Sequence, residues 1–274
     1  MVPGFLIALR EGLEAALIVG ITLSVLSKAG QEQYRKWVWL GVGSAVILSV
    51  IVAGALQAFG ATLEGRAEEI FEGATMLLAA GVLTWMIFWM FRQSKHYQDY
   101  IAHGVQQAAS HNQRWGLFGI AFFAVLREGI ETALFLSATA LTISRDQTFL
   151  GGVAGLAVAG LLGWALFASA IRLNIRRFFQ VTSILLILFA AGLFAHGVHE
   201  FIEVGWIPSL IDPVWNINSI LDEESIVGSF LQALFGYNGN PSLTESLAYF
   251  GYFAIVLLGI RKVSREQGHV EYAL

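Results

Sequence analysis

The chain has few charged residues for its length and no cysteine at all. Charged residues make up 13% of its 274 residues, about half of the roughly 25% found in soluble domains. Hydrophobic residues make up 56%, and the mean hydropathy is +0.66. These values exclude an ordinary soluble domain and indicate a protein that lies mostly in lipid. The absence of cysteine excludes disulfides and thiolate metal sites, and it leaves the redox compartment undetermined.

Two further features are missing. The sequence has no run of basic residues, so the footprint expected of a nucleic-acid-binding protein is absent. The N-terminus, MVPGFLIALR, has no positively charged start and no small-residue cleavage site, which favours a first membrane helix over a signal peptide. Proline is rare, with 4 residues, whereas glycine is frequent, with 29. Frequent glycine is typical of membrane helices that pack closely.

Long apolar runs divide the chain into seven segments that could each cross a bilayer, which takes about 20 mostly apolar residues. The segments are 3–27, 37–59, 69–91, 115–142, 149–171, 178–203 and 243–260. The sequence therefore predicts an all-α polytopic membrane protein that forms a single transmembrane domain over 1–274. Between the sixth and seventh segments, the loop 204–242 contains an apolar stretch with helical spacing, Ser225–Tyr237. This short helix lies either on the membrane surface or in a re-entrant piece that caps a cavity.

Lysine and arginine are unevenly distributed over the loops. One set of loops and ends carries most of them: Lys28, Arg35, Lys36, Arg92, Lys95, Arg114, Arg172, Arg176, Arg177, Arg261, Lys262 and Arg265. The other set carries only Arg66 and Arg145 and is rich in acidic residues. Because positive loops stay in the cytoplasm, this pattern predicts an N-terminus outside and a C-terminus inside the cytoplasmic membrane.

One short motif occurs twice. Arg10-Glu11-Gly12-Leu13-Glu14 in the first segment aligns with Arg127-Glu128-Gly129-Ile130-Glu131 in the fourth. Three segments separate the two copies, so the copies cross the bilayer in opposite directions. The sequence thus predicts two inverted repeats, at about 1–92 and 114–203, with the seventh segment added. Transporters built in this way bind their substrate near the midplane, where the halves meet.

The motif concentrates charge inside the membrane. On a helix, residues three and four positions apart are neighbours, so each copy joins two carboxylates to one guanidinium. A charged residue at a membrane helix centre costs about 2.5–3.5 kcal/mol, so these groups must face one another or a hydrated cavity. Four glutamates outnumber two arginines, and the negative surplus needs protons or a cation. Three interpretations follow: structural ion pairs, a proton relay, and a cation site, which we favour because buried ion pairs stabilise poorly.

The ligand types narrow the choice of cation. Carboxylate oxygens suit hard ions such as Mg²⁺, Ca²⁺, Mn²⁺ or ferric iron. The methionines of the third segment have the spacing of packing residues, and there is no cysteine, so Cu(I) is disfavoured. From the residues alone, the candidate metal ligands are Glu11, Glu14, Glu128 and Glu131, supported by Arg10 and Arg127.

A second acidic region is expected at the outer surface. Glu72, His199 and Glu200 are its principal candidate ligands. Four neighbours are weaker candidates: Glu68, Glu69, His196 and Glu203. A carboxylate-rich mouth raises the local cation concentration, so these residues could pass ions inward.

The paired motifs resemble the oxidase-dependent iron permease family, which includes the fungal high-affinity iron permease and bacterial EfeU. The similarity extends over most of the chain and includes four shorter matches: FEG at 71–73, TWMIFWM at 84–90, IRLN at 171–174 and HE at 199–200. It implies iron uptake across the cytoplasmic membrane, with ferric iron delivered by a periplasmic or extracellular oxidase or iron-binding protein. Iron is then a substrate, and no permanent cofactor is implied.

Other functions remain open from the sequence. The same site could transport another hard divalent cation such as Mn²⁺, or it could serve a membrane iron sensor. The predicted cytoplasmic loops are short and carry no recognisable output domain, which disfavours a sensor. No nucleotide or cofactor motif appears, which disfavours an enzyme.

Overall fold

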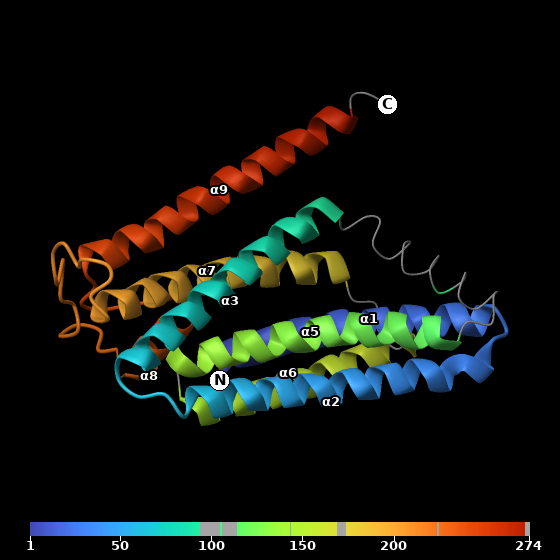
Figure 1. The fold of residues 1–274 in the computed structure, drawn as a ribbon. Coiled ribbons are helices and arrows are strands. Elements are labelled where there is room, and N and C mark those ends of the chain that lie inside the picture. Colours follow the sequence, from blue (N-terminus) through green and yellow to red (C-terminus); the bar gives the residue numbers. More distant parts are fainter. Residues whose placement is uncertain (94–104, 106–113, 143, 169–173, 224, 272–274) are drawn as a thin grey trace.

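The computed structural model describes residues 1–93, 105, 114–142, 144–168, 174–223 and 225–271, and within these all regular structure is helical (Figure 1). The long helices are α1 (Val2–Lys28), α2 (Arg35–Gly60), α3 (Arg66–Gln93), α5 (Arg114–Thr142), α6 (Arg145–Phe167), α7 (Ile175–Glu203) and α9 (Leu243–Glu271). A single 3₁₀ turn, Glu32–Tyr34, precedes α2, and the ten-residue α8 (Ile226–Phe235) lies between α7 and α9.

Each of the seven predicted segments corresponds to one long helix. Within the described residues, five stretches are long and apolar enough to cross a membrane: Glu32–Gly60, Arg66–Trp89, Arg145–Phe167, Arg177–Glu203 and Leu243–Lys262. These stretches make the chain an integral membrane protein. The other two long helices, α1 and α5, have 27 and 29 residues and carry the charged motifs. Their crossing of the membrane stays a prediction.

The predicted boundaries of two segments differ from the helices. The segment expected at 149–171 begins earlier, at Arg145, and its helix α6 ends at Phe167. Hydropathy placed its start too late because the first turn is polar, with Asp146 at a helix N-terminus where a negative charge is favourable. Helix α9 continues past the apolar stretch to Glu271.

The predicted short helix in the loop 204–242 is α8. The Ser225 hydroxyl caps it by accepting a hydrogen bond from the Gly228 N–H at 2.9 Å. Gly236 ends it in the left-handed region, with φ of 66°, and packs directly against Gly192 of α7. Because α8 also contacts α1 and α5, it belongs to the end of the helix bundle. Its position relative to the membrane surface stays a prediction.

The long helices pack in two groups. Helices α1, α2, α5 and α6 lie side by side, and the closest pairs are α1 with α6, α2 with α5, and α1 with α5 (Figure 1). Helices α3, α7 and α9 form a second group, in which α7 contacts both of the others. A shared apolar core joins the groups, for example Ile7 and Phe135 from the first with Met76 and Leu186 from the second. We call them the four-helix group and the three-helix group.

Glycines allow the close approach within the four-helix group. A side chain at Gly155 of α6 would meet the backbone of α1 at the Phe5 oxygen and at the Leu9 nitrogen, the latter 2.9 Å away. A side chain at Gly41 of α2 would lie 2.6 Å from the Phe118 oxygen of α5. Gly155 and Gly41 therefore serve helix contacts within one chain.

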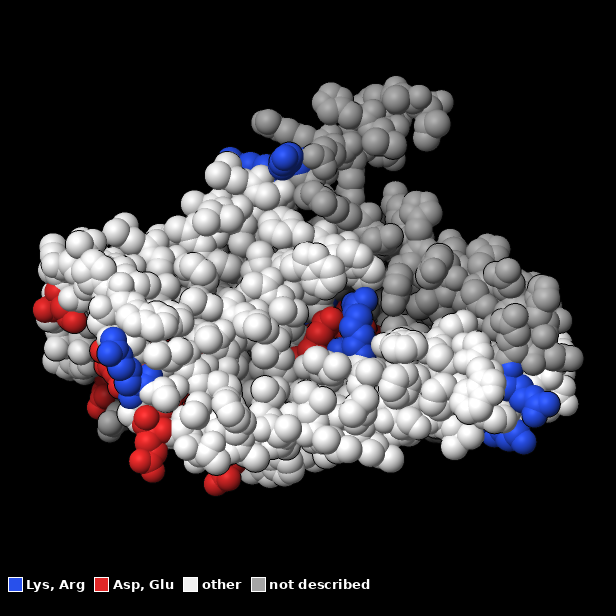
Figure 2. Space-filling model, in the orientation of Figure 1, with Lys and Arg blue, Asp and Glu red and all other residues white. Residues whose placement is uncertain are grey.

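The charges of the described residues separate along the helix axes. At one end, which we call the acidic end, lie Glu68 and Glu69 of α3, Glu203 of α7 and Glu245 of α9. At the other, the basic end, lie Lys28, Arg35, Lys36 and Arg114 (Figure 2). Lys95 and Arg172, which contributed to the predicted orientation, lie outside the described residues, and the side chains of Arg92, Arg176 and Arg265 are not described.

The glycine packing predicts opposite effects for two substitutions on α6. Gly155→Ala should lower stability by about 1–3 kcal/mol, because the added carbon forces α6 away from the α1 backbone. Gly160→Ala is the matched control: its position is open, and alanine favours a helix by up to about 1 kcal/mol. Thermal unfolding of the two purified variants in detergent measures the difference. Equal melting temperatures would contradict the close approach.

Candidate metal centre

The first motif forms a buried ion-pair cluster on α1. Arg10 is fully buried, and its Nη1 lies 2.6 Å from Glu11 Oε1 while its Nη2 lies 2.8 Å from Glu14 Oε1. The Arg10 guanidinium therefore holds both glutamates of its own helix with separate nitrogens. The three-helix group encloses it: Nη1 also lies 3.2 Å from the Met86 sulfur of α3, and Phe179 of α7 lies 5.8 Å from Cζ.

The second motif has the same pairs in a looser form on α5. Arg127 Nε lies 3.1 Å from Glu131 Oε1 and 3.4 Å from Glu128 Oε1. The Arg127 side chain is 30% exposed, whereas that of Arg10 has no exposure. The ring of Trp89 on α3 lies 4.8 Å from the Arg127 Cζ. Figure 2 shows charged atoms of both signs in a hollow near the middle of this face, between its charged ends.

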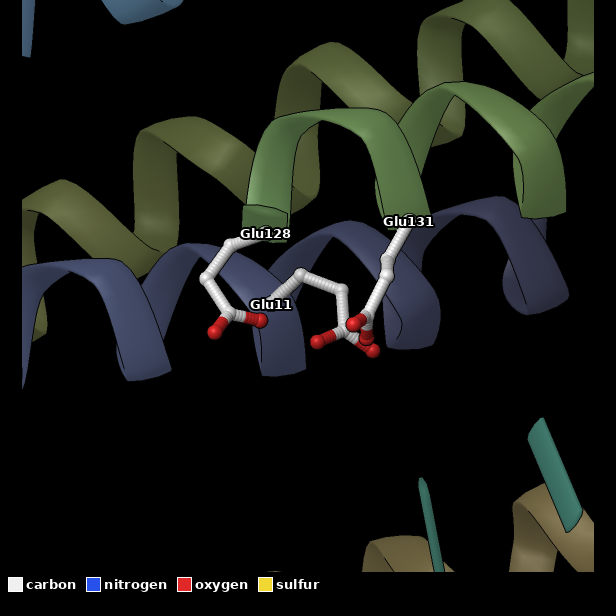
Figure 3. A group of neighbouring side chains, drawn as sticks. All are labelled: Glu11, Glu128 and Glu131. Carbon is white, nitrogen blue, oxygen red and sulfur yellow. The ribbon is translucent and has the colours of Figure 1, made fainter. Parts of the chain in front are cut away.

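Three of the four motif carboxylates converge. Glu11, Glu128 and Glu131 each offer an oxygen, and these oxygens all lie within 4.8 Å of one another, as Figure 3 shows. All three residues are buried. Each also has a second oxygen, Oε2, that lacks a hydrogen-bond partner among the described residues. Three buried carboxylates with unused oxygens form a site that suits a multivalent hard cation.

Glu14 is the exception among the predicted ligands. Its carboxylate is held by Arg10 and does not belong to the converging three. It still interacts electrostatically with Glu11 and with Arg127. The structure therefore divides the predicted set into three carboxylates that can share one ion and a fourth that accompanies Arg10.

The glycine within each motif explains how the carboxylates can face inward on closely packed helices. A side chain at Gly12 would lie 2.7 Å from the Ala159 side chain of α6. A side chain at Gly129 would overlap the Ser49 side chain of α2. In each motif, the glycine thus packs against a helix of the four-helix group, while the glutamates point toward α3 and α7 (Figure 3).

The site lies well inside the bundle. At about 1.5 Å per residue, Glu11 lies about 14 Å from the start of α1 at Val2, and Glu131 lies about 17 Å from the end of α5 at Thr142. Both distances are measured from the acidic end. The three carboxylates are therefore near the middle of helices that are long enough to span a bilayer.

The residues predicted for the outer mouth lie at the acidic end, in two neighbouring sets. Glu72 lines a pocket with residues of α2, α5 and α6, including Arg145, and it interacts with Glu68. Glu200 lies close enough to Glu72 and Glu69 to interact electrostatically. These carboxylates form the first set, between α3 and α7.

The second set connects α7 to α9. His199 lies 3.5 Å from Glu203 through Nε2 and 3.4 Å from Glu245 through Nδ1. Glu245 also accepts a hydrogen bond from the Asn238 side chain at 2.8 Å. The predicted neighbour His196 lies beside His199, with ring centroids 6.0 Å apart. Within the described part of the chain, only Glu11, Glu128 and Glu131 have the spacing of metal ligands.

The sequence interpretation missed four residues that shape these sites. Met86, Trp89 and Phe179 contact the two motif arginines, and Glu245 pairs with His199. Apolar and aromatic residues inside membrane helices give no signal of their own. Glu245 did give a sequence signal, because it is a carboxylate at the start of an apolar segment.

Comparisons with known proteins identify the family of this chain. A model of the Iron permease FTR1 family matches residues 1–265. The "Ferrous iron permease EfeU" of Yersinia pestis is 33% identical over 256 residues, which cover 93% of this chain and 91% of the relative. The proteins of the same name from Escherichia coli O6:H1 and Shigella sonnei are 34% identical, with 93% of each chain covered. No solved structure matches. With its integral membrane helices, the chain is a transporter that moves iron across a membrane, and it belongs to the iron permease FTR1 family.

Proposed function

We propose that iron crosses the membrane through a site made by Glu11, Glu128 and Glu131, halfway along α1 and α5. The observation that supports this most strongly is the convergence of three buried carboxylates, each with an oxygen that lacks a hydrogen-bond partner among the described residues. A multivalent cation would satisfy those oxygens and balance the negative surplus of the two motifs. Arg10 and Arg127 limit the net charge while the site is empty.

The direction of transport follows from the charge distribution. With the basic end in the cytoplasm, the N-terminus of α1 lies outside and the acidic end faces the periplasm or the extracellular space. Iron would then collect near Glu72 and Glu200, with the residues around His199 close by, before it moves inward to the buried site. The membrane is the cytoplasmic membrane, and seven helices cross it.

The packing supports an inverted repeat. If α1–α3 correspond to α5–α7, then the contact of α1 with α6 is the counterpart of the contact of α5 with α2, and these are the two most extensive contacts in the bundle. The motif glycines follow the same rule, because Gly12 packs on α6 and Gly129 packs on α2.

The same packing bears on how the site opens. Rocking of two rigid halves would separate α1 from α6 and α2 from α5, at the glycine contacts where the backbones approach most closely. The carboxylates instead face α3 and α7, across the boundary between the four-helix and three-helix groups (Figure 3). We therefore propose that movement at this boundary, rather than between the halves, opens the site to each side.

Ferric iron is the form we propose at the site, because a set of carboxylate oxygens suits a hard ion. An outer oxidase or iron-binding partner would supply it, as the family resemblance implies. The similar proteins are named ferrous iron permeases, so Fe(II) is the second candidate. Sealed vesicles that contain the protein, supplied in parallel with Fe(II), Fe(III), Mn²⁺ and Zn²⁺, distinguish these cargoes. Metal that accumulates inside also distinguishes transport from the sensor alternative.

Removing one converging carboxylate should abolish transport. Glu131→Gln keeps the shape of the side chain but loses its charge, and a charge-assisted contact is worth about 1.5–3 kcal/mol. We expect iron binding to weaken by at least about tenfold and uptake into vesicles to fall to background. The control is Glu32→Gln, a change at an exposed surface pair with Arg35. Normal uptake by Glu131→Gln, in protein that inserts at wild-type levels, would refute the site.

The two arginines should differ in their tolerance of lysine. Arg10 uses two nitrogens to hold Glu11 and Glu14 in a fully buried position, and a lysine ammonium cannot reproduce that fork. Arg127 contacts both of its carboxylates through the same atom, Nε, and is partly exposed. Arg10→Lys should therefore lose uptake and thermal stability, whereas Arg127→Lys should retain more of both. The reverse order would contradict the unequal roles of the two arginines.

A further inference from the structure

One helix of the three-helix group contacts both motif arginines. Met86 of α3 lies against Arg10, and Trp89 lies against Arg127. The two residues are three positions apart, so they share one face of α3. Although the arginines come from different helices of the four-helix group, they are both held by this single face.

The two contacts differ in kind. Arg10 is enclosed on all sides, and its two terminal nitrogens each hold a glutamate, so its guanidinium has no room to change partners. Arg127 is 30% exposed and lies at longer distances from its carboxylates. The Trp89 ring lies 4.8 Å from its Cζ, within the range of a cation–π interaction. Arg127 is therefore shared between two carboxylates and an aromatic face.

A cation in the site changes this balance. The carboxylates of Glu128 and Glu131 then bind the ion instead of Arg127. The ion also repels the positive charge of Arg127 at short range. When the Arg127 guanidinium leaves the carboxylates, its buried part needs another stabilising contact, since only 30% of the side chain is exposed. The indole face of Trp89 is already in position to supply one.

We propose that Trp89 is a positioning residue that holds the Arg127 guanidinium when iron displaces it from Glu128 and Glu131. The inference rests on the proposed function, because it requires the ion to occupy those carboxylates. Arg10 also pairs with Glu11, but its second ion pair with Glu14 holds it in place, so Arg127 is the arginine that exchanges partners during a cycle. Trp89 thereby sets iron affinity without contacting iron, and it links occupancy of the site to α3.

Substitutions at Trp89 test this role by equilibrium binding of radioactive iron to the purified full-length protein and by uptake into vesicles. Trp89→Leu should raise both the dissociation constant and the half-saturating iron concentration by about fivefold, which corresponds to a partly exposed cation–π contact of about 1 kcal/mol. Trp89→Phe should have a smaller effect, since phenylalanine is a weaker partner for a cation. The matched control is Trp85→Leu, because Trp85 is one turn away on α3 and 59% exposed; it should bind iron as the wild type does.

A double-mutant cycle with Arg127→Gln separates positioning from general packing. Glutamine carries no charge for the indole to hold, so Trp89→Leu should then have little further effect on iron binding. An equal loss of affinity in both backgrounds would overturn the inference, as would wild-type binding by Trp89→Leu. If Trp89→Leu fails to fold, Trp89→Phe supports the same cycle.

Glu131→Gln, measured in the same assays, tells the two proposals apart. If Glu131→Gln loses iron binding while Trp89→Leu keeps it, the inference fails and the site stands. If Glu131→Gln binds iron normally, the proposed site itself fails.

Discussion

The cost of holding carboxylates inside an apolar bundle constrains the rest of this structure. Six ionisable side chains from two motifs lie near the middle of α1 and α5, where each would cost about 2.5–3.5 kcal/mol if it faced lipid. The glutamates are brought together and paired with arginines, and three of them retain unused oxygens among the described residues. The close glycine contacts of α1 with α6 and of α5 with α2 keep the opposite faces of the motif helices sealed. The apolar helices thus hold the carboxylates together away from lipid, where a cation can bind to their unused oxygens.

The sequence predicted much of this arrangement, for identifiable physical reasons. Within the described residues, hydropathy located the seven long helices, five of which are long and apolar enough to cross a membrane. The spacing of Arg10 and Glu14 predicted their ion pair, because residues four positions apart are neighbours on a helix face. The additional pair of Arg10 with the adjacent Glu11 did not follow from spacing. The repeated motif also predicted that α1 and α5 would meet through their carboxylates, which Glu11, Glu128 and Glu131 do.

The rest could not be read from the sequence, since it depends on contacts between distant segments. Nothing in the motif distinguishes Glu14 from Glu11, and Arg10 holds both, yet the position of α5 brings only Glu11 together with Glu128 and Glu131. Met86 and Trp89 look like ordinary packing residues until α3 is placed across the arginines. The partner of His199 was equally hidden, because Glu245 is brought to it only by the return of the chain through α8 and α9.

The helices of the first predicted repeat pack mainly against helices of the second, and this has a consequence for biogenesis. Helices α1 and α2 find their principal neighbours in α6 and α5, which the ribosome makes later. Until those helices have been made, the charged stretch of α1 lacks the helix contacts that make its burial in the bundle favourable. The nascent N-terminal portion must therefore wait in a sheltered or partly hydrated place at the translocation machinery, and the bundle assembles only after synthesis has passed α6.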